Sequence, residues 1–518
     1  MKYVALVVFL LLIHHLSAQN PNGIPVRVTV AEGIIEGDLD NRTGIKTFFG
    51  VPYAAPPLGP LRWRAPQPTP AWEGVKVTKQ FGHRPVQTYL WHDMLFRSAG
   101  LSEDCLTLNV WTPAKHGEGG LPVLVYIHGG GDVGGDGSEH RYDGAALAER
   151  GIVVVTINYR LNVFGNLAHP ELSAESPDGV SGNYGALDQS FAINWVRDNA
   201  AAFGGDPARI TIGGESAGSM AVSLHMASPL TRGALAGAIG QSGAMIAPTG
   251  PPVAPAVAEQ VGKDFVDKTG YSFAEFRELP TAVLFELYRD HRPDFPLVVD
   301  GKLIPKTLPE AFAAGEQAAV PLLIGWNSAE LPAAAILRPP YSRAAFEALV
   351  NERTGDHAAR LLPHYPGTSG RALEQSVSDF GSDNWIVYST WKWFDLHRRS
   401  GAPVYRYRFD KLRPANDRGE RPAALGAPHA AEIEYALGNL DRVPIWQWTD
   451  EDHRVSATMT DYFANFIKTG DPNGGDLPRW PAAGQGDTPP VLYLDVETAA
   501  RPSTVEARYR ALDKFYEK

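Results

Sequence analysis

Cysteine is almost absent from this 518-residue chain, which contains only Cys105. The chain can therefore form no internal disulfide, and one cysteine cannot build a thiolate metal site. Its stability must come from burial of apolar side chains, and a chain of this length with 44% hydrophobic residues can bury a large core. The zinc-binding pattern H-E-x-x-H is also missing. The sequence thus predicts neither a metal nor a cofactor.

Long apolar runs are equally scarce. The run Val4–Ile13 covers about ten residues, whereas a membrane-spanning helix needs roughly 18 or more. One lysine precedes this run, and the small pair Ser17-Ala18 follows it. This pattern is typical of a cleaved export signal, which we place at residues 1–18. We expect residues 19–518 to be secreted or periplasmic, without a membrane span.

Positive charge is in deficit, since 47 Lys and Arg residues face 58 Asp and Glu residues, for a net charge of −11. An acidic chain repels nucleic acids and anionic membrane surfaces. We therefore expect a small-molecule partner and no nucleic-acid partner, and the oligomeric state stays open. The sequence contains no internal repeat and no convincing interdomain linker.

The apolar pattern changes along the chain. Two early segments, from Val26 and Lys46, are rich in β-branched and aromatic residues and predict a small antiparallel sheet. Continuous apolar runs follow, beginning at Pro122, Ile152, Arg209, Leu235, Pro321 and Pro403. Such runs indicate central strands of a mostly parallel sheet, and helical patterns lie between them. The alternation predicts a doubly wound α/β fold whose ligands bind at the carboxyl ends of the strands.

Ser216 stands in the segment GESAG, which fits the pattern G-x-S-x-G. The apolar segment RITI precedes it, and a segment without internal proline follows it, as a strand-turn-helix requires. A nucleophile elbow holds its serine in a sterically costly turn and needs small residues two positions away on each side, here Gly214 and Gly218. Ser216 is therefore a candidate nucleophile, with an ordinary turn serine as the alternative.

A nucleophilic serine also needs donors for the oxyanion that forms during attack. The predicted strand from Pro122 runs into His128-Gly129-Gly130-Gly131, a loop whose amides can point at a carbonyl oxygen. We predict an oxyanion hole formed by the amides of Gly130, Gly131 and Ala217. The alternative is a flexible glycine turn.

Several motifs together resemble the type-B carboxylesterase and cholinesterase-like family of α/β-hydrolases. They are EDCLTLNVWTP, HGGG, NYRLNVFG, GNYGALDQSFAINWV, FGGDP and GESAGS, in this order. The resemblance extends from about Val26 to FIKTGDPN near the C-terminus. It implies the α/β-hydrolase fold in a single domain over residues 19–518, and a serine carboxylesterase that works through an acyl-enzyme. A lipase-like hydrolase and a non-catalytic binding protein of the same fold are the alternatives.

The resemblance also assigns the base and the acid. PHAAEIEYALG matches the family pattern H-x-x-E-x-x-Y and assigns the base to His429. PLLIGWNSAEL assigns the acid to Glu330, although Leu331 replaces the family's glycine. The order serine, acid, histidine is that of an α/β-hydrolase triad. Glu215 and Glu432 remain alternative acids, and Ser242 is interpreted as a turn serine, with a hydrogen bond within the site as the alternative.

The chain departs from the family at three places. Pro85 replaces the first cysteine of a family disulfide, so we expect Cys105 to be a buried free thiol and the loop Val86–Asp104 to be looser. Leu95 occupies the position of the cholinesterases' cation-binding tryptophan, which gives no support for choline specificity. Asp132 replaces an aromatic residue after the glycine loop.

Asp132 is a candidate substrate-binding residue. With Asp136 and Glu139 it would form an acidic rim that favours cationic esters. The alternative is a solvated turn aspartate.

Overall fold

A 13-stranded sheet is the centre of the molecule, and its strand order is β1-β2-β3-β5-β7-β6-β8-β9-β10-β11-β12-β13, with β4 paired to β2. The computed structural model describes residues 23–115, 117–420 and 425–517. The predicted export signal, residues 1–18, lies outside the described residues.

The central strands pair in parallel, as the continuous apolar runs predict. These strands are β6 (Leu121–Ile127), β7 (Val153–Ile157), β8 (Gly205–Glu215), β9 (Leu235–Gln241), β10 (Leu322–Asn327), β11 (Val404–Phe409) and β12 (Pro490–Leu494).

Antiparallel pairs extend both ends of the sheet. The N-terminal end consists of β1 (Gly23–Val30), β2 (Gly33–Asp40), β3 (Lys46–Pro52) and β5 (Thr107–Thr112), with the short β4 (Val75–Val77) beside β2, and β13 (Ala499–Pro502) closes the other end. The predicted α/β class, a mostly parallel sheet with a small antiparallel N-terminal part, is confirmed.

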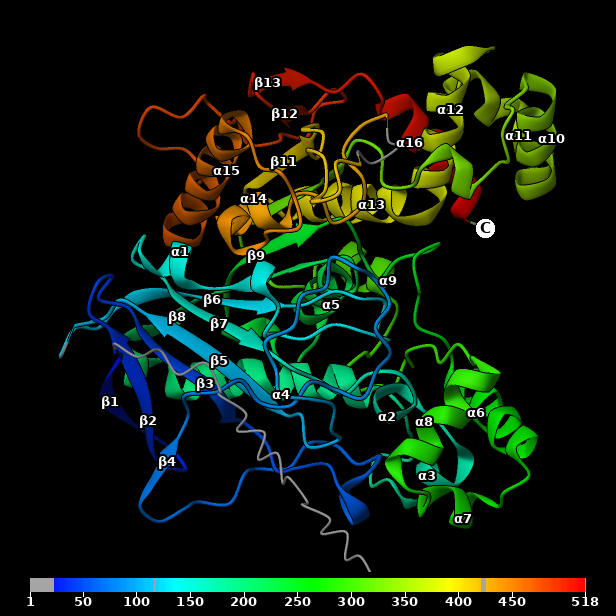
Figure 1. Cartoon of the computed structure of the whole chain (residues 1–518). Helices are drawn as coiled ribbons and strands as arrows, with labels where there is room; N and C mark the ends of the chain where they lie inside the picture. Colours follow the sequence, from blue (N-terminus) through cyan, green and yellow to red (C-terminus); the bar gives the residue numbers. More distant parts are fainter. Residues whose placement is uncertain (1–22, 116, 421–424, 518) are drawn as a thin grey trace, which may run out of the picture.

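Successive side chains of a strand point to opposite faces of the sheet, and β6 shows that both faces are buried. Val123, Val125 and Ile127 pack into the core cluster that contains residues of α4 (Tyr184–Asn199) and α5 (Ala217–Ala227). Leu124 and Tyr126 pack into a second cluster with residues of α14 (Ile433–Leu437) and α15 (Asp450–Thr469). Helices α4 and α15 accordingly lie on opposite sides of the sheet (Figure 1).

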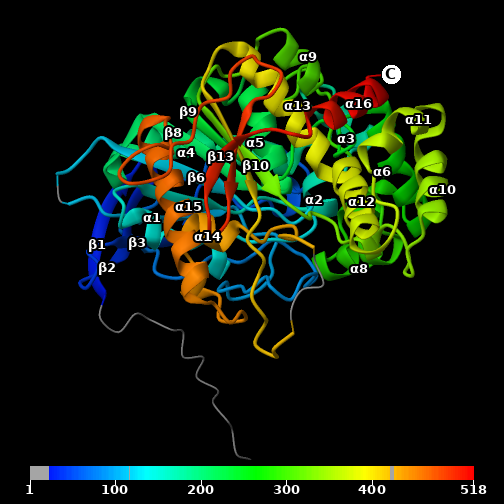
Figure 2. The same cartoon turned by 90° about the horizontal axis from the view of Figure 1, so that it is seen from above.

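Among the remaining helices, α13 contacts β10 and β11, and α1 contacts β5 and β7. A third core cluster joins α6 and α7 to residues near α2 and α3. Figure 2 shows α10, α11 and α12 at the end opposite β1 and β2. These helices are α1 (Ala145–Ala148), α2 (Asn162–Asn166), α3 (Pro170–Glu175), α6 (Pro255–Thr269), α7 (Phe273–Arg277), α8 (Thr281–His291), α9 (Leu308–Ala313), α10 (Arg343–Thr354), α11 (Ala358–Leu361), α12 (Gly370–Ser382), α13 (Tyr388–His397) and α16 (Glu506–Tyr516). In the described part of the chain, no helix has the length and apolar character needed to cross a bilayer.

The sheet brings distant segments together at the carboxyl ends of its strands. β8 ends at Glu215, directly before Ser216, and its neighbour β6 ends at Ile127, directly before His128. β10 ends at Asn327, three residues before Glu330. Parallel strands place all these carboxyl ends at one edge of the sheet, so the fold gathers the predicted site residues there.

Candidate active site

Ser216 lies in the sharp turn between β8 and α5, with φ 57° and ψ −123°. A non-glycine residue with positive φ is strained and persists only where the surrounding structure imposes it. The close packing explains the flanking glycines. A Cβ on Gly218 would lie 2.1 Å from the Ile127 carbonyl oxygen, and one on Gly214 would lie 2.5 Å from the Gly218 carbonyl carbon. The turn thus has the backbone strain and tight packing expected of a nucleophile elbow.

His429 connects the hydroxyl of Ser216 to the carboxylate of Glu330. Its Nε2 lies 2.9 Å from Ser216 Oγ, and its Nδ1 lies 2.7 Å from Glu330 Oε2. The fold therefore brings the three residues of the predicted triad into direct contact.

Glu330 is held on its other oxygen as well. Its Oε1 accepts hydrogen bonds from the Asn327 backbone N–H at 2.6 Å and from the Ser242 hydroxyl at 2.6 Å. The interpretation of Ser242 as a simple turn serine is wrong, because its hydroxyl orients the carboxylate that contacts His429. The alternative, a hydrogen bond within the site, is the one observed, and the sequence did not identify its partner because the contact joins residues 88 positions apart.

The two alternative acids occupy different places. Glu432 accepts from the Asn327 side-chain amide at 2.6 Å and from Gln241 Nε2 at 3.3 Å, so it supports the segment behind the histidine. Glu215 Oε1 lies 3.3 Å from His429 Nε2, on the side of the ring that faces Ser216. Of the three carboxylates, Glu330 is the one hydrogen-bonded to Nδ1.

The buried carboxylates shape the protonation of the site. Burial raises the pKa of Glu215 to about 8 and that of Glu432 to about 7. Burial of His429 lowers its pKa, but the nearby charge of Glu215 and the hydrogen bond to Glu330 outweigh this effect and raise it to about 9. The imidazolium formed by proton transfer from a serine is therefore stabilised in this position.

The predicted oxyanion glycines follow β6 in a tight loop. Gly130 and Gly131 have φ of 112° and 62°, which glycine adopts without strain. Within the described residues, their backbone N–H groups donate to no backbone carbonyl. Gly131 and Ala217 line one cavity of about 210 Å³. Ala217 is the first residue of α5, where a backbone N–H has no partner within the helix.

Asp132 lines the same cavity as Gly131 and Ala217. Its φ is 57°, and its carbonyl oxygen accepts from the Asn162 backbone N–H at 2.7 Å. Burial raises the pKa of its carboxyl to about 6. Among the described residues, no cation lies within ion-pair distance of this carboxylate. Asp132 therefore presents an unpaired acid to the cavity.

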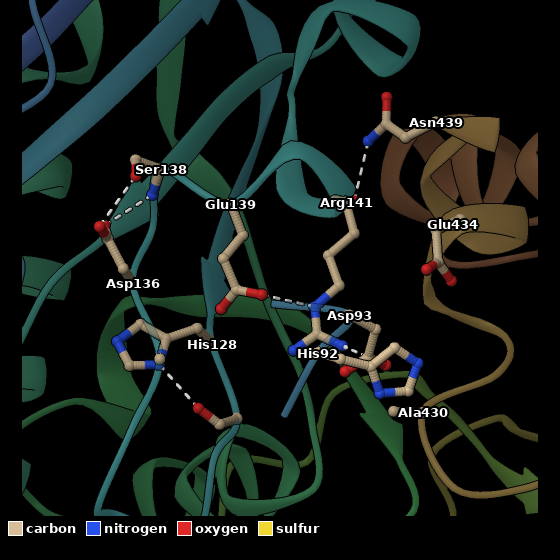
Figure 3. Close-up of polar contacts among 12 residues, drawn as sticks. His92, Asp93, His128, Asp136, Ser138, Glu139, Arg141, Ala430, Glu434 and Asn439 are labelled. Atoms are coloured by element: carbon tan, nitrogen blue, oxygen red, sulfur yellow. Dashed lines mark hydrogen bonds and ion pairs between the residues drawn. The ribbon is translucent and has the colours of Figure 1, made fainter. Parts of the chain in front are cut away.

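The prediction that Asp136 and Glu139 join Asp132 in an acidic rim is wrong. Both side chains are buried, and Figure 3 shows Asp136 facing Ser138 and Glu139 facing Arg141. Asp136 accepts hydrogen bonds from Ser98 and Ser138, and Glu139 lies 2.8 Å from Arg141. Packing of the loop Val86–Asp104 over this segment turns these acids inward.

Cys105 is a buried free thiol, as predicted. The loop Val86–Asp104 is held by polar contacts, and that it is looser than a disulfide-closed loop stays a prediction. Gln87, Arg97 and Ser98 all bond to the segment that follows the oxyanion glycines.

Two further groups at the site went unpredicted. Trp385, in a π-helical turn (Asp383–Val387), packs its ring edge-on against His429, with ring centroids 4.7 Å apart. Asp294 lines the cavity with Asp132. π-helical turns are rare and are often found at functional sites, but no periodicity in the sequence marks them. In the described part of the chain, no group of three or more His, Cys, Asp or Glu side chains could hold a metal ion.

Comparison with known proteins gives the same picture over nearly the whole chain. The sequence model of the family described as "Carboxylesterase family" matches residues 25–512. This chain belongs to the carboxylesterase family. Its activity is the hydrolysis of carboxylic esters through an acyl-enzyme, as in the family generally.

Named relatives of the esterase cover most of its length. It is 35% identical to the fumonisin B1 esterase of Sphingopyxis macrogoltabida, over 86% of this chain and 82% of that protein. It is 34% identical to the para-nitrobenzyl esterase of Bacillus subtilis (strain 168), over 91% of this chain and 95% of that protein. The solved carboxylesterase of Geobacillus stearothermophilus superposes with a TM-score of 0.81 at 31% identity, covering 94% of this chain and 99% of that one. The α/β-hydrolase fold of the esterase is thereby confirmed.

Proposed function

We propose that this esterase uses Ser216 as its nucleophile, His429 as its general base and Glu330 as the acid that orients the base. The contacts from Glu330 Oε2 through the imidazole to Ser216 Oγ, at 2.7 and 2.9 Å, carry this proposal. Glu330 holds the proton of the imidazole on Nδ1, which leaves Nε2 free to accept the proton of the serine hydroxyl.

Acylation begins when Nε2 of His429 takes the hydroxyl proton and Ser216 Oγ attacks the ester carbonyl carbon. The negative charge on the carbonyl oxygen is held by the amides of Gly130, Gly131 and Ala217. The imidazolium then gives its proton to the departing alcohol, and the acyl group stays on Ser216. Water, deprotonated by the same imidazole, attacks the acyl-enzyme and releases the carboxylic acid.

Replacement of Ser216 by alanine tests the nucleophile. We expect kcat on a soluble aryl ester to fall by at least about 10⁴-fold, the scale of triad deletions elsewhere. We also expect an organophosphate to label the wild-type protein on Ser216 and to abolish its activity. Near-normal turnover by the Ser216→Ala protein would refute the assignment.

Comparison of soluble short-chain esters with long-chain emulsions tests the lipase-like alternative, which requires a preference for the emulsions.

For the substrate, we propose a preference for esters that carry a positive charge. Asp132 and Asp294 line the cavity beside the oxyanion glycines, and no Lys or Arg occurs among the described residues that line it. An unpaired carboxylate in such a place lowers the energy of a bound cation and raises that of a bound anion. The relatives are named for several different esters, so their names do not select one substrate.

The Asp132→Asn variant tests this preference with two esters of the same alcohol, one with a cationic and one with a neutral acyl group. We expect the cationic-to-neutral ratio of kcat/KM to fall by about tenfold, equivalent to about 1.4 kcal/mol. The neutral ester serves as the internal control. A ratio unchanged within about twofold would contradict the proposal.

We further propose that residues 1–18 direct export, that the mature protein is secreted or periplasmic, and that residues 19–518 form one domain. The apolar run Val4–Ile13 and the small pair Ser17-Ala18 support export. The long separation between Ser216 and His429 supports one domain, because both must meet in a single site. N-terminal sequencing of the exported protein and limited proteolysis test these points, and a stable active fragment would oppose the single domain.

A further inference from the structure

The Gln87 side chain makes hydrogen bonds with the backbone N–H and the backbone carbonyl of Gly135, a few residues after Gly130 and Gly131. Its Nε2 donates to the Gly135 carbonyl at 2.7 Å, and the Gly135 N–H donates to its Oε1 at 2.8 Å. The Gln87 side chain is buried, with 4% of the residue exposed. Because these hydrogen bonds are buried, their loss would leave polar groups of Gly135 without partners.

Gly135 in turn packs directly against the start of the glycine loop. A Cβ on Gly135 would lie 2.3 Å from His128 Nδ1 and 2.4 Å from the Gly129 carbonyl oxygen. A Cβ on Gly130 would lie 2.1 Å from the Gly134 carbonyl oxygen. Residues 134 and 135, here called the return arm, thus support the backbone of the oxyanion glycines in atomic contact.

Further contacts hold the same loop to the segment beyond the return arm. The Ser138 hydroxyl accepts from the Arg97 and Ser98 backbone N–H groups, and Arg97 Nη1 donates to Asp143 at 2.6 Å. Figure 3 shows Ser138 also bonded to the inward-facing Asp136. These contacts order the segment, whereas the Gln87 bonds act on the return arm itself.

We propose that Gln87 is a positioning residue for catalysis: by fixing the return arm through Gly135, it sets where the amides of Gly130 and Gly131 point. This inference rests on the oxyanion role proposed above for those glycines. An oxyanion donor stabilises charge only when it is aimed at the place where the charge develops. A displacement of about 1 Å near the reacting atoms can cost about 10²-fold in rate. Gln87 does not touch the substrate and acts through the backbone.

The test compares Gln87→Met with a matched control, Thr112→Val. Methionine keeps the length and approximate volume of glutamine and removes the two hydrogen bonds to Gly135, together with a third, from Gln87 Nε2 to the Pro85 carbonyl at 3.1 Å. Thr112 is buried in β5, and its hydroxyl also makes one donated and one accepted bond to backbone groups, with the Phe203 carbonyl at 2.7 Å and the Ala114 N–H at 3.1 Å. Thr112→Val therefore removes the same kinds of bond away from the site. A third variant, Gln87→Glu, keeps an acceptor for the Gly135 N–H and, in its protonated form, a donor for the Gly135 carbonyl.

We expect Gln87→Met to lower kcat for an aryl ester by about 10- to 100-fold, with KM changed by less than about threefold. We expect the inhibition constant of an aryl trifluoromethyl ketone to rise in parallel, because Ser216 Oγ adds to its carbonyl carbon and the resulting oxyanion needs the same amides. Gln87→Glu should lose less kcat than Gln87→Met. Thr112→Val should lower Tm and keep kcat within about twofold.

Three outcomes would overturn the positioning role: kcat of Gln87→Met within about twofold of wild type, a loss carried by KM alone, or a kcat loss no larger than that of Thr112→Val at equal Tm. If Gln87→Met does not fold, Gln87→Leu, which removes the same hydrogen bonds, carries the same comparison. Failure of the Gln87 proposal can be distinguished from failure of the proposed catalytic function. If only the Gln87 proposal fails, Ser216→Ala is inactive and Gln87→Met is active. If the proposed catalytic function fails, Ser216→Ala is itself active.

Discussion

The Glu330→Gln variant tests how the carboxylate sets the tautomer of His429. In the wild-type protein, Glu330 Oε1 accepts from two donors, the Asn327 backbone N–H and the Ser242 hydroxyl, both at 2.6 Å. Its Oε2 faces His429 Nδ1 at 2.7 Å. A glutamine has only one oxygen for these two places. The backbone N–H of Asn327 cannot become an acceptor, so the glutamine oxygen must stay on that side.

The glutamine then presents its NH₂ group to the imidazole. A donor opposite Nδ1 forces the ring proton onto Nε2, the nitrogen that must accept the proton of Ser216. The opposite amide orientation would bury two donors face to face, at a cost of about 1–3 kcal/mol. We expect kcat to fall by about 10⁴-fold, which corresponds to about 5 kcal/mol of lost transition-state stabilisation.

A stopped-flow burst experiment with an aryl ester measures the acylation step, and a thermal melt checks that the variant is folded. Ser242→Ala is the matched control, because it removes one donor to Glu330 and leaves the carboxylate and its contact with His429. We expect Ser242→Ala to lose no more than about tenfold in kcat, the scale of one hydrogen bond to a charged group. A Glu330→Gln protein that is folded and acylates within about tenfold of wild type would refute the tautomer argument.

Three further predictions concern the site and the buried core. The Glu215 charge raises the pKa of His429, and only the neutral imidazole can act as base. The acid limb of the kcat/KM profile should therefore lie above pH 6.5 and move to lower pH in Glu215→Gln. An unmoved limb would contradict the coupling. Gly218→Ala should lower the free energy of unfolding, measured in urea, by about 1–3 kcal/mol, because its Cβ would lie 2.1 Å from the Ile127 carbonyl oxygen. An unchanged free energy of unfolding would show that the turn can relax. Burial raises the pKa of the Cys105 thiol well above its usual range, so a thiol reagent should label it only after the protein unfolds. Fast labelling of the native protein would contradict its burial.

Local sequence carried the prediction of the elbow. Ser216 lies within a few residues of the strand before it, the helix after it and the glycines on either side. The steric demand for small residues at Gly214 and Gly218 acts over the same short range, so it is visible in the sequence. The buried strands were equally predictable, because apolar runs reflect burial on both faces of a sheet.

His429 and Glu330 were different, since the contacts that join them to each other and to Ser216 span long stretches of the chain. Fifteen histidines occur in the sequence, and only the family resemblance singled out His429. The contact on which its proposed role as base depends is made with a serine 213 positions away. Such contacts depend on the order of the strands in the sheet, and the residues of one segment do not determine that order.

The largest errors arose where one loop packs on another. Asp136 and Glu139 look like exposed acids of a polar turn, and both are buried. Ser98, in the loop Val86–Asp104, donates to Asp136, and Asp93 of the same loop lies 3.7 Å from Arg141, the partner of Glu139. By itself the sequence determined the strands, the strained turn and the chemical kind of residue available at each position. Only the tertiary structure decided which carboxylates reach the cavity and which turn inward, because burial and hydrogen bonding of a charged side chain are set by segments remote in sequence.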